Sequence, residues 1–179
     1  MNNIIINADD FGKDKKTTLA IVEAINLGIC TNTTLMVNMP YADQAVALAK
    51  KNNFIEHVGL HINLTEGKPL NSSIKKIKTF CDDYGNFTGE FRRNKKNRLI
   101  MNTLETNAIL EEIEAQIQKF IAYGFKTIHI DSHHHIHTDR PILIILKKII
   151  TKYNIRSIRL SRNLYGQISF PVKIYKKKI

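Results

Sequence analysis

Most of this 179-residue chain alternates between short apolar runs and segments in which apolar residues recur at helical spacing. Five apolar runs have the length and pattern of β-strands, namely 3–8, 29–38, 58–64, 127–138 and 155–160. The segments between them predict helices over 17–27, 41–50, 104–123 and 141–153. Regular alternation of this kind is typical of parallel strands joined by right-handed crossovers. We therefore predict an α/β fold, either an open doubly wound sheet or a (β/α) barrel.

The first run is continuous and β-branched through Ile4, Ile5 and Ile6, which predicts a strand buried on both faces. Thr17 or Thr18 is expected to cap the helix that follows. No Gly-rich phosphate loop stands between this strand and this helix, which argues against a dinucleotide-binding or P-loop enzyme.

Polar side chains stand at the ends of three predicted strands. Asp9 and Asp10 follow the first run, His61 and Asn63 lie in the third, and 131–133 lie in the fourth. In an open α/β sheet and in a (β/α) barrel alike, ligands bind at the carboxyl ends of the strands. A lone buried histidine or an Asp-Asp turn is weak evidence, but their coincidence at equivalent positions indicates a divalent metal site.

The fourth run, 127–138, holds five of the seven histidines of the chain. If it is extended, His129, Asp131 and His133 point to one face, and His135 and His137 join them if the extension continues. The alternative is a polar cluster on the surface, since His-rich tracts are compositional signals. The two other strand ends favour the metal site.

Two histidines and one carboxylate suit zinc, iron, cobalt or manganese better than magnesium. A metal held in this way can activate water and polarise a carbonyl group. The second carboxylate of the Asp9-Asp10 pair would then be available to take the proton of that water. Asp131 or a spare histidine could orient a ligand imidazole.

The segment 65–102 breaks the alternation, with three glycines, one proline and many lysines and arginines. A connection of this length is uncommon in a compact domain unless it has a function. We predict that it is an insertion over the mouth of the site, within a single domain that covers 1–179.

The bulk composition predicts a cytoplasmic protein that does not bind membranes. No apolar run approaches the length of a membrane span, and the first ten residues lack the pattern of a signal peptide. The net charge of +11 is spread over separate clusters, which favours solvated faces over a nucleic-acid groove. Two distant cysteines argue against a disulfide framework.

Three segments of the chain resemble the signatures of the YdjC-like carbohydrate deacetylases, a family that includes the chitooligosaccharide deacetylases. They are Asn7-Ala-Asp-Asp-Phe-Gly12, the segment 59–70 that contains His61, and the histidine-rich segment 129–137. The segments 31–34 and 158–163 are similar to family members in the same order. The resemblance covers essentially the whole chain.

The resemblance implies an irregular (β/α) barrel and metal-dependent hydrolysis of N-acetyl groups on an acetylated carbohydrate. By position, Asp10, His61 and His133 match the family's metal ligands, with His135 as the alternative to His133, and Asp9 matches the general base. Asp131, His135 and Asn63 are further candidates for contacts behind the ligands or to substrate. The family's metal is usually taken to be magnesium, whereas the ligand types favour zinc or another transition metal.

Family members continue beyond the segment 158–163, with further strands and a late motif that supplies the acid. About five strands do not close a barrel. We therefore expect a truncated product, a domain completed by a partner chain, or an open domain whose unpaired edge favours a homodimer. The alternative functions are a metal-dependent phosphoesterase and an inactive fragment that binds only metal or sugar.

Overall fold

The computed structural model describes residues 4–93, 99–125, 128–160 and 173–176. Six strands form one sheet in chain order: β1 (Asn7–Phe11), β2 (Asn32–Leu35), β3 (Val58–Ile62), β4 (His129–Ser132), β5 (Ser157–Leu160) and β6 (Lys173–Lys176). Every pairing in this sheet is parallel, which confirms the predicted α/β class. β6 was not predicted, because the sequence around it has little periodicity. Asn3 and Thr127, which begin two predicted strands, and the stretches 161–172 and 177–179 lie outside the described residues.

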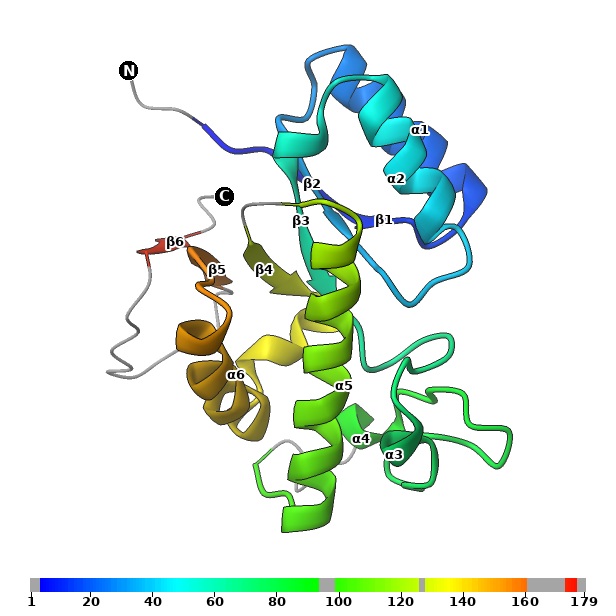
Figure 1. Ribbon diagram of the computed structural model, residues 1–179, viewed down its shortest axis with the longest axis vertical. Helices are drawn as coiled ribbons and strands as arrows, with labels where there is room; N and C mark the ends of the chain where they lie inside the picture. The colour runs from blue at the N-terminus through cyan, green and yellow to red at the C-terminus, as the bar shows by residue number, and fades with distance from the viewer. Residues whose placement is uncertain (1–3, 94–98, 126–127, 161–172, 177–179) are drawn as a thin grey trace.

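Helices connect the strands and cover the sheet. They are α1 (Lys15–Asn26), α2 (Ala42–Lys51), α3 (Ser72–Lys75), α4 (Glu90–Arg93), α5 (Thr103–Ala122) and α6 (Arg140–Lys152), with short 3-10 helices η1 (Ile55–His57) and η2 (His133–Thr138). In Figure 1, α1 and α2 lie together beside β1 and β2, whereas the long α5 runs past β3 and beside α6. Within the described residues, no helix is both long and apolar enough to cross a bilayer.

The first strand does not begin where its apolar run begins. Ile4, Ile5 and Ile6 are 76%, 52% and 48% exposed, and the pairing of β1 with β2 starts only at Asn7. The prediction of a buried strand over 3–8 is therefore wrong. A β-branched run favours extended backbone, but it does not decide which residues of the chain the neighbouring strand reaches.

Local capping decides where the helices begin. The carboxylate of Asp14 accepts a hydrogen bond from the backbone N–H of Thr17 at 2.8 Å, so α1 is capped by Asp14 and not by Thr17 or Thr18. Asn102 and Glu105 form a reciprocal capping box at the start of α5. Each cap satisfies backbone N–H groups that have no partner inside the helix.

The segment 65–102 is ordered by buried side chains where the structure describes it, up to residue 93 and from residue 99. The rings of Phe80 and Phe91 lie 4.9 Å apart in the core, and Cys81 forms an isolated bridge with Phe87. Glu112 on α5 accepts hydrogen bonds from the backbone N–H groups of Leu70 and Asn71. The segment is thus attached to α5, and its place over the mouth of the site stays a prediction.

The side chain of His129 on β4 lies over position 59 on β3, where the chain has a glycine. A Cβ atom on Gly59 would overlap the ring of His129, with Nε2 as its nearest atom. We expect Gly59→Ala to lower the free energy of unfolding by about 1–3 kcal/mol through overpacking. Urea denaturation of the purified variant measures this loss.

The matched control is Gly59→Ala in a His129→Ala background, where the obstructing ring is gone. There the added methyl group should cost much less. An equal loss in both backgrounds would show that contact with His129 is not the cause.

Candidate metal centre

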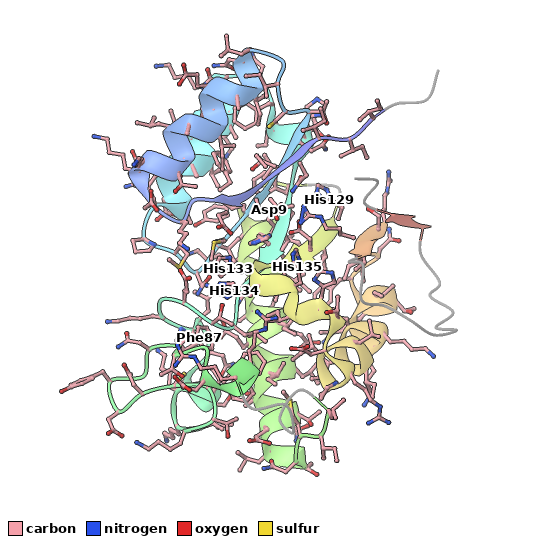
Figure 2. All side chains as sticks on the ribbon, turned by 180° about the vertical axis from the view of Figure 1, so that it is seen from behind. Asp9, Phe87, His129, His133, His134 and His135 are labelled. Carbon is pink, nitrogen blue, oxygen red and sulfur yellow. The ribbon has the colours of Figure 1, made fainter. Side chains whose placement is uncertain are left out.

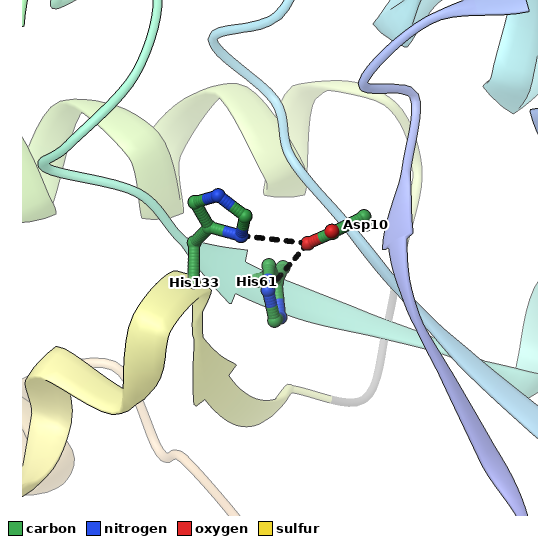
Figure 3. Close-up of side chains that lie close together, drawn as sticks. All are labelled: Asp10, His61 and His133. Atoms are coloured by element: carbon green, nitrogen blue, oxygen red, sulfur yellow. Dashed lines mark hydrogen bonds and ion pairs between the residues drawn. The ribbon is translucent and has the colours of Figure 1, made fainter. Parts of the chain in front are cut away.

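Asp10, His61 and His133 meet at the carboxyl end of the sheet, from the ends of β1 and β3 and the start of η2. One carboxylate oxygen of Asp10, Oδ1, lies 2.7 Å from Nδ1 of His133 and 3.1 Å from Nε2 of His61 (Figure 3). The two imidazoles stand edge to face, with their centroids 5.7 Å apart. The three residues form a cluster in which each offers one ligand atom within 4.8 Å of the others.

A β-bulge brings both aspartates of β1 to this site. β1 carries one more residue than β2 between Ala8 and Phe11, and Asp10 adopts a left-handed conformation with φ of 70°. In a regular strand, neighbouring side chains point to opposite faces. Here Asp10 contacts His61, while Asp9 forms a second cluster with His61 and Asp131. Aspartate tolerates positive φ better than most residues, and bulges commonly re-aim side chains next to active sites.

The charged groups of the site shift one another's pKa values. Burial opposes the charged form of Asp10, but hydrogen bonds with His133 and His61 outweigh it and hold the pKa of Asp10 far below its usual range. Burial also opposes the imidazolium of His61, yet Asp131 and Asp10 raise its pKa to about 9. Near neutral pH the ring of His61 is therefore an imidazolium, and a cation that binds Nε2 must displace the proton on that nitrogen.

Asp131 holds His61 from behind. Its Oδ1 lies 2.5 Å from Nδ1 of His61, and its other oxygen accepts from the hydroxyl of Thr34 at 3.2 Å. Burial raises the pKa of Asp131, but His61 and Arg159 outweigh it and bring the pKa to about 2. An ionised Asp131 fixes the ring of His61 so that Nε2 faces Asp10.

Asp9 is not a free carboxylate. Both of its oxygens accept hydrogen bonds from Arg159, at 2.6 and 2.8 Å, and Asn7 donates to one of them at 2.8 Å. The same guanidinium reaches Asp131 at 2.8 Å. Arg159 therefore fixes the orientation of Asp9 next to the metal cluster. In Figure 2, Asp9 and His133 are seen in the same region of the sheet, in agreement with their shared neighbour His61.

The chain turns directly after β4, so the histidines do not share one face as an extended strand would require. His134 and His135 both have positive φ, 55° and 56°, and the extension ends at Ser132. His133 is buried beside Asp10, whereas His134 and His135 are exposed. Among the described residues, the group of candidate metal ligands with Asp10 and His61 contains His133 and does not contain His135.

Asn63 shapes a loop. Its side-chain oxygen accepts from the backbone N–H groups of Thr65 and Glu66, and its amide donates to the backbone oxygen of Glu66 at 2.8 Å. Gln116 on α5 holds the backbone of Asn63 through both its N–H and its carbonyl group. Asn63 thereby fixes the turn that carries Glu66 to within 3.0 Å of His133.

His137 connects the histidine segment to β5. Its Nε2 donates to the backbone carbonyl of Arg159 at 2.9 Å, so its Nδ1 accepts from the hydroxyl of Ser132. Burial, the largest influence, lowers the pKa of His137 to about 4, which keeps the ring neutral near neutral pH. The histidine thus holds the residue that orients Asp9.

We expect His137→Ala to destabilise the fold by about 1–3 kcal/mol for each buried partner left without a hydrogen bond. His137→Gln should recover part of this loss, because its amide can still donate to the carbonyl of Arg159. Urea unfolding measures both variants. Unfolding free energies equal to that of the wild type would contradict this role of His137.

The donor set fits a divalent cation. Two imidazole nitrogens and one carboxylate oxygen lie close enough together to hold one ion, and Asp10 is partly exposed, which leaves an open side for further ligands. Such a set with open positions suits a catalytic metal of the zinc, iron, cobalt or manganese type.

Sequence reasoning left four residues of this site without a role, although each lies in or next to a motif it had singled out. Arg159 falls in 158–163, Thr34 in 31–34, Glu66 in 59–70, and Lys13 directly after 7–12. Their partners are distant in the sequence, so only the folded chain reveals the roles.

The chain is similar to a described protein family, to curated proteins and to a solved structure. The family described as YdjC-like protein matches residues 3–174. The carbohydrate deacetylase of Clostridium beijerinckii is 37% identical over 156 residues, covering 85% of this chain and 58% of the relative. That of Halalkalibacterium halodurans is 39% identical over 153 residues, covering 85% and 61%.

A solved structure from Enterococcus faecalis V583, of a protein proposed to cleave cellobiose phosphate, is similar with a TM-score of 0.76 and 30% identity, covering 89% of this chain and 59% of that one. The chain thus spans about three fifths of the length of the relatives it matches. The family match over nearly all of its residues confirms the resemblance of the three motifs: this chain belongs to the YdjC-like protein family.

Proposed function

We propose that this protein is a metal-dependent carbohydrate deacetylase that removes acetyl groups from N-acetylated sugars. One observation carries the proposal. Asp10, His61 and His133 converge beside an oriented second carboxylate, Asp9, in a chain whose relatives are named carbohydrate deacetylases.

Three residues bind the metal and a fourth transfers the proton. Asp10, His61 and His133 would hold a divalent cation, which would supply polarisation of the acetyl carbonyl group and activation of water. Asp9, held by Arg159, accepts the proton of the attacking water. The amide C–N bond breaks as its nitrogen takes up a proton, and the products are acetate and a free amino sugar.

The arrangement of the carboxylates supports amide hydrolysis over phosphoester hydrolysis. A two-metal phosphoesterase needs carboxylates that bridge ions about 3.5–4 Å apart. Asp9 and Asp131 are near enough to His61 to be considered for a second ion, but both are engaged by the guanidinium of Arg159. A cation placed among them would face this positive charge.

A paired assay tests the proposal. The protein, loaded in turn with Mg²⁺, Mn²⁺, Co²⁺ and Zn²⁺, is incubated with N-acetylated chito-oligosaccharides and, separately, with p-nitrophenyl phosphate. Acetate release without phosphate release is the expected result. Phosphate release alone would favour the phosphoesterase, and metal retained without release of either product would favour a fragment that only binds.

A further inference from the structure

We propose that Glu66 positions His133 so that its Nδ1 atom, and not Nε2, binds the metal. The ring of His133 lies between two carboxylates: Nδ1 is 2.7 Å from Asp10, and Nε2 is 3.0 Å from Oε1 of Glu66. This inference rests on the proposed metal site and assigns a role to a residue outside the ligand set.

The position of the proton on His133 decides which ring nitrogen is left for a metal. An ionised carboxylate can only accept hydrogen bonds, and a neutral imidazole carries one N–H. When a cation takes the place of the proton between Nδ1 and Asp10, the single N–H of a neutral His133 lies on Nε2 and donates to Glu66. The carboxylate behind a ligand histidine commonly selects the tautomer in this way.

His61 also has a carboxylate behind its ring, but that carboxylate contacts Nδ1 and not Nε2. Its Nδ1 faces Asp131 at 2.5 Å, which leaves Nε2 to face Asp10 at 3.1 Å. Each ligand histidine therefore has its own carboxylate behind it, and the two carboxylates select opposite tautomers. Nε2 of His61 and Nδ1 of His133 then point to the same carboxylate, Asp10.

Glu66 is itself fixed from two sides. Its second oxygen, Oε2, lies 2.8 Å from the ammonium group of Lys13, and Asn63 holds its backbone N–H and carbonyl groups. Burial raises the pKa of Glu66, but hydrogen bonds with Lys13 and His133 outweigh it and lower the pKa below its usual value. Glu66, which follows β3, thus contacts Lys13, which follows β1, and His133, which follows β4.

The same contacts argue against a second cation. Glu66, His133 and His134 are close enough to be considered as a ligand group. However, one oxygen of Glu66 is paired with Lys13, and Nδ1 of His134 is hydrogen-bonded to the hydroxyl of Thr65 at 3.0 Å. Both oxygens of Glu66 are engaged, which suits an orienting role.

The test is a Co²⁺ titration of the whole chain, with affinity obtained by competition with a chelator. Glu66→Ala should weaken Co²⁺ binding about 10–100-fold, as loss of a partner behind a ligand histidine typically does. Glu66→Gln should lose less, because its amide oxygen still accepts from Nε2. Glu90→Ala, an exposed glutamate paired with Arg93 in the same segment, is the matched control and should bind as the wild type does.

A second measurement does not depend on affinity. Long-range ¹H–¹⁵N spectra of the zinc-loaded protein should show His133 with Nε2 protonated and Nδ1 bound to metal. The opposite tautomer would overturn the proposal, as would Glu66→Ala binding Co²⁺ as tightly as the wild type. Two bound Co²⁺ ions, one of them lost in Glu66→Ala, would also contradict it by making Glu66 a ligand.

The result separates this inference from the proposed metal site. If Asp10→Asn also leaves Co²⁺ binding unchanged, the metal site itself is wrong. If Asp10→Asn abolishes binding and Glu66→Ala does not weaken it, only the role of Glu66 is wrong.

Discussion

Replacing Asp10 by asparagine should abolish metal binding and acetate release together. Asp10 is the one anionic member of the cluster and contacts both histidines through a single oxygen. Loss of a partner behind a ligand already costs about 10–100-fold in metal affinity, so loss of the charged ligand should cost more than about 100-fold. Asparagine keeps the size of the side chain and tolerates the left-handed backbone at this position.

Metal content of the purified variant, together with Co²⁺ affinity, measures this effect. Asp83→Asn, at an exposed aspartate paired with Lys78, is the control and should retain both metal and activity. Acetate release at the wild-type rate from an Asp10→Asn protein that holds no metal would refute metal dependence.

The second large effect is expected at Asp9. Asp9→Asn should lower acetate release by about 10²–10⁴-fold, the usual contribution of a general base, while the metal stays bound. The two effects separate because Asp9 contacts Arg159 and Asn7, whereas the cluster with Asp10 and His133 does not include it. Steady-state acetate release and Co²⁺ affinity, measured on one preparation, give both values.

Arg159 keeps an ion-pair partner in this variant, because Asp131 still accepts from its guanidinium. Thermal unfolding of the metal-free variant shows whether the fold is intact. Full activity in a folded Asp9→Asn protein would remove Asp9 as the base, and loss of metal would place it among the ligands.

The order of the first five strands and of the four long helices could be predicted from the sequence because periodicity changes clearly between them, whereas β6 and the short helices α3 and α4 could not. The residues at which the strands begin and end could be predicted less well. Ile4 to Ile6 form a run typical of a buried strand, yet they precede the paired part of β1 and are exposed. The turn after Ser132 places two histidines at positive φ, a conformation that is uncommon outside glycine and that no pattern in the sequence signals.

The site could be predicted as a set of residue types but not as a network. The position of Asp10, His61 and His133 at strand ends follows from parallel topology. The pairing of Asp9 with Arg159 joins residues 150 positions apart, and that of Glu66 with His133 joins residues 67 apart. Such contacts depend on side-chain direction at the bulge and in the loops, which spacing along the chain does not determine.

A crystal structure of the protein grown with Zn²⁺, with anomalous diffraction recorded at the zinc edge, tests the central claim most directly. We predict one strong anomalous peak bound by a carboxylate oxygen of Asp10, Nε2 of His61 and Nδ1 of His133, at about 2.0–2.2 Å from each. A peak bound elsewhere, or an empty site between these three residues at saturating zinc, would contradict it.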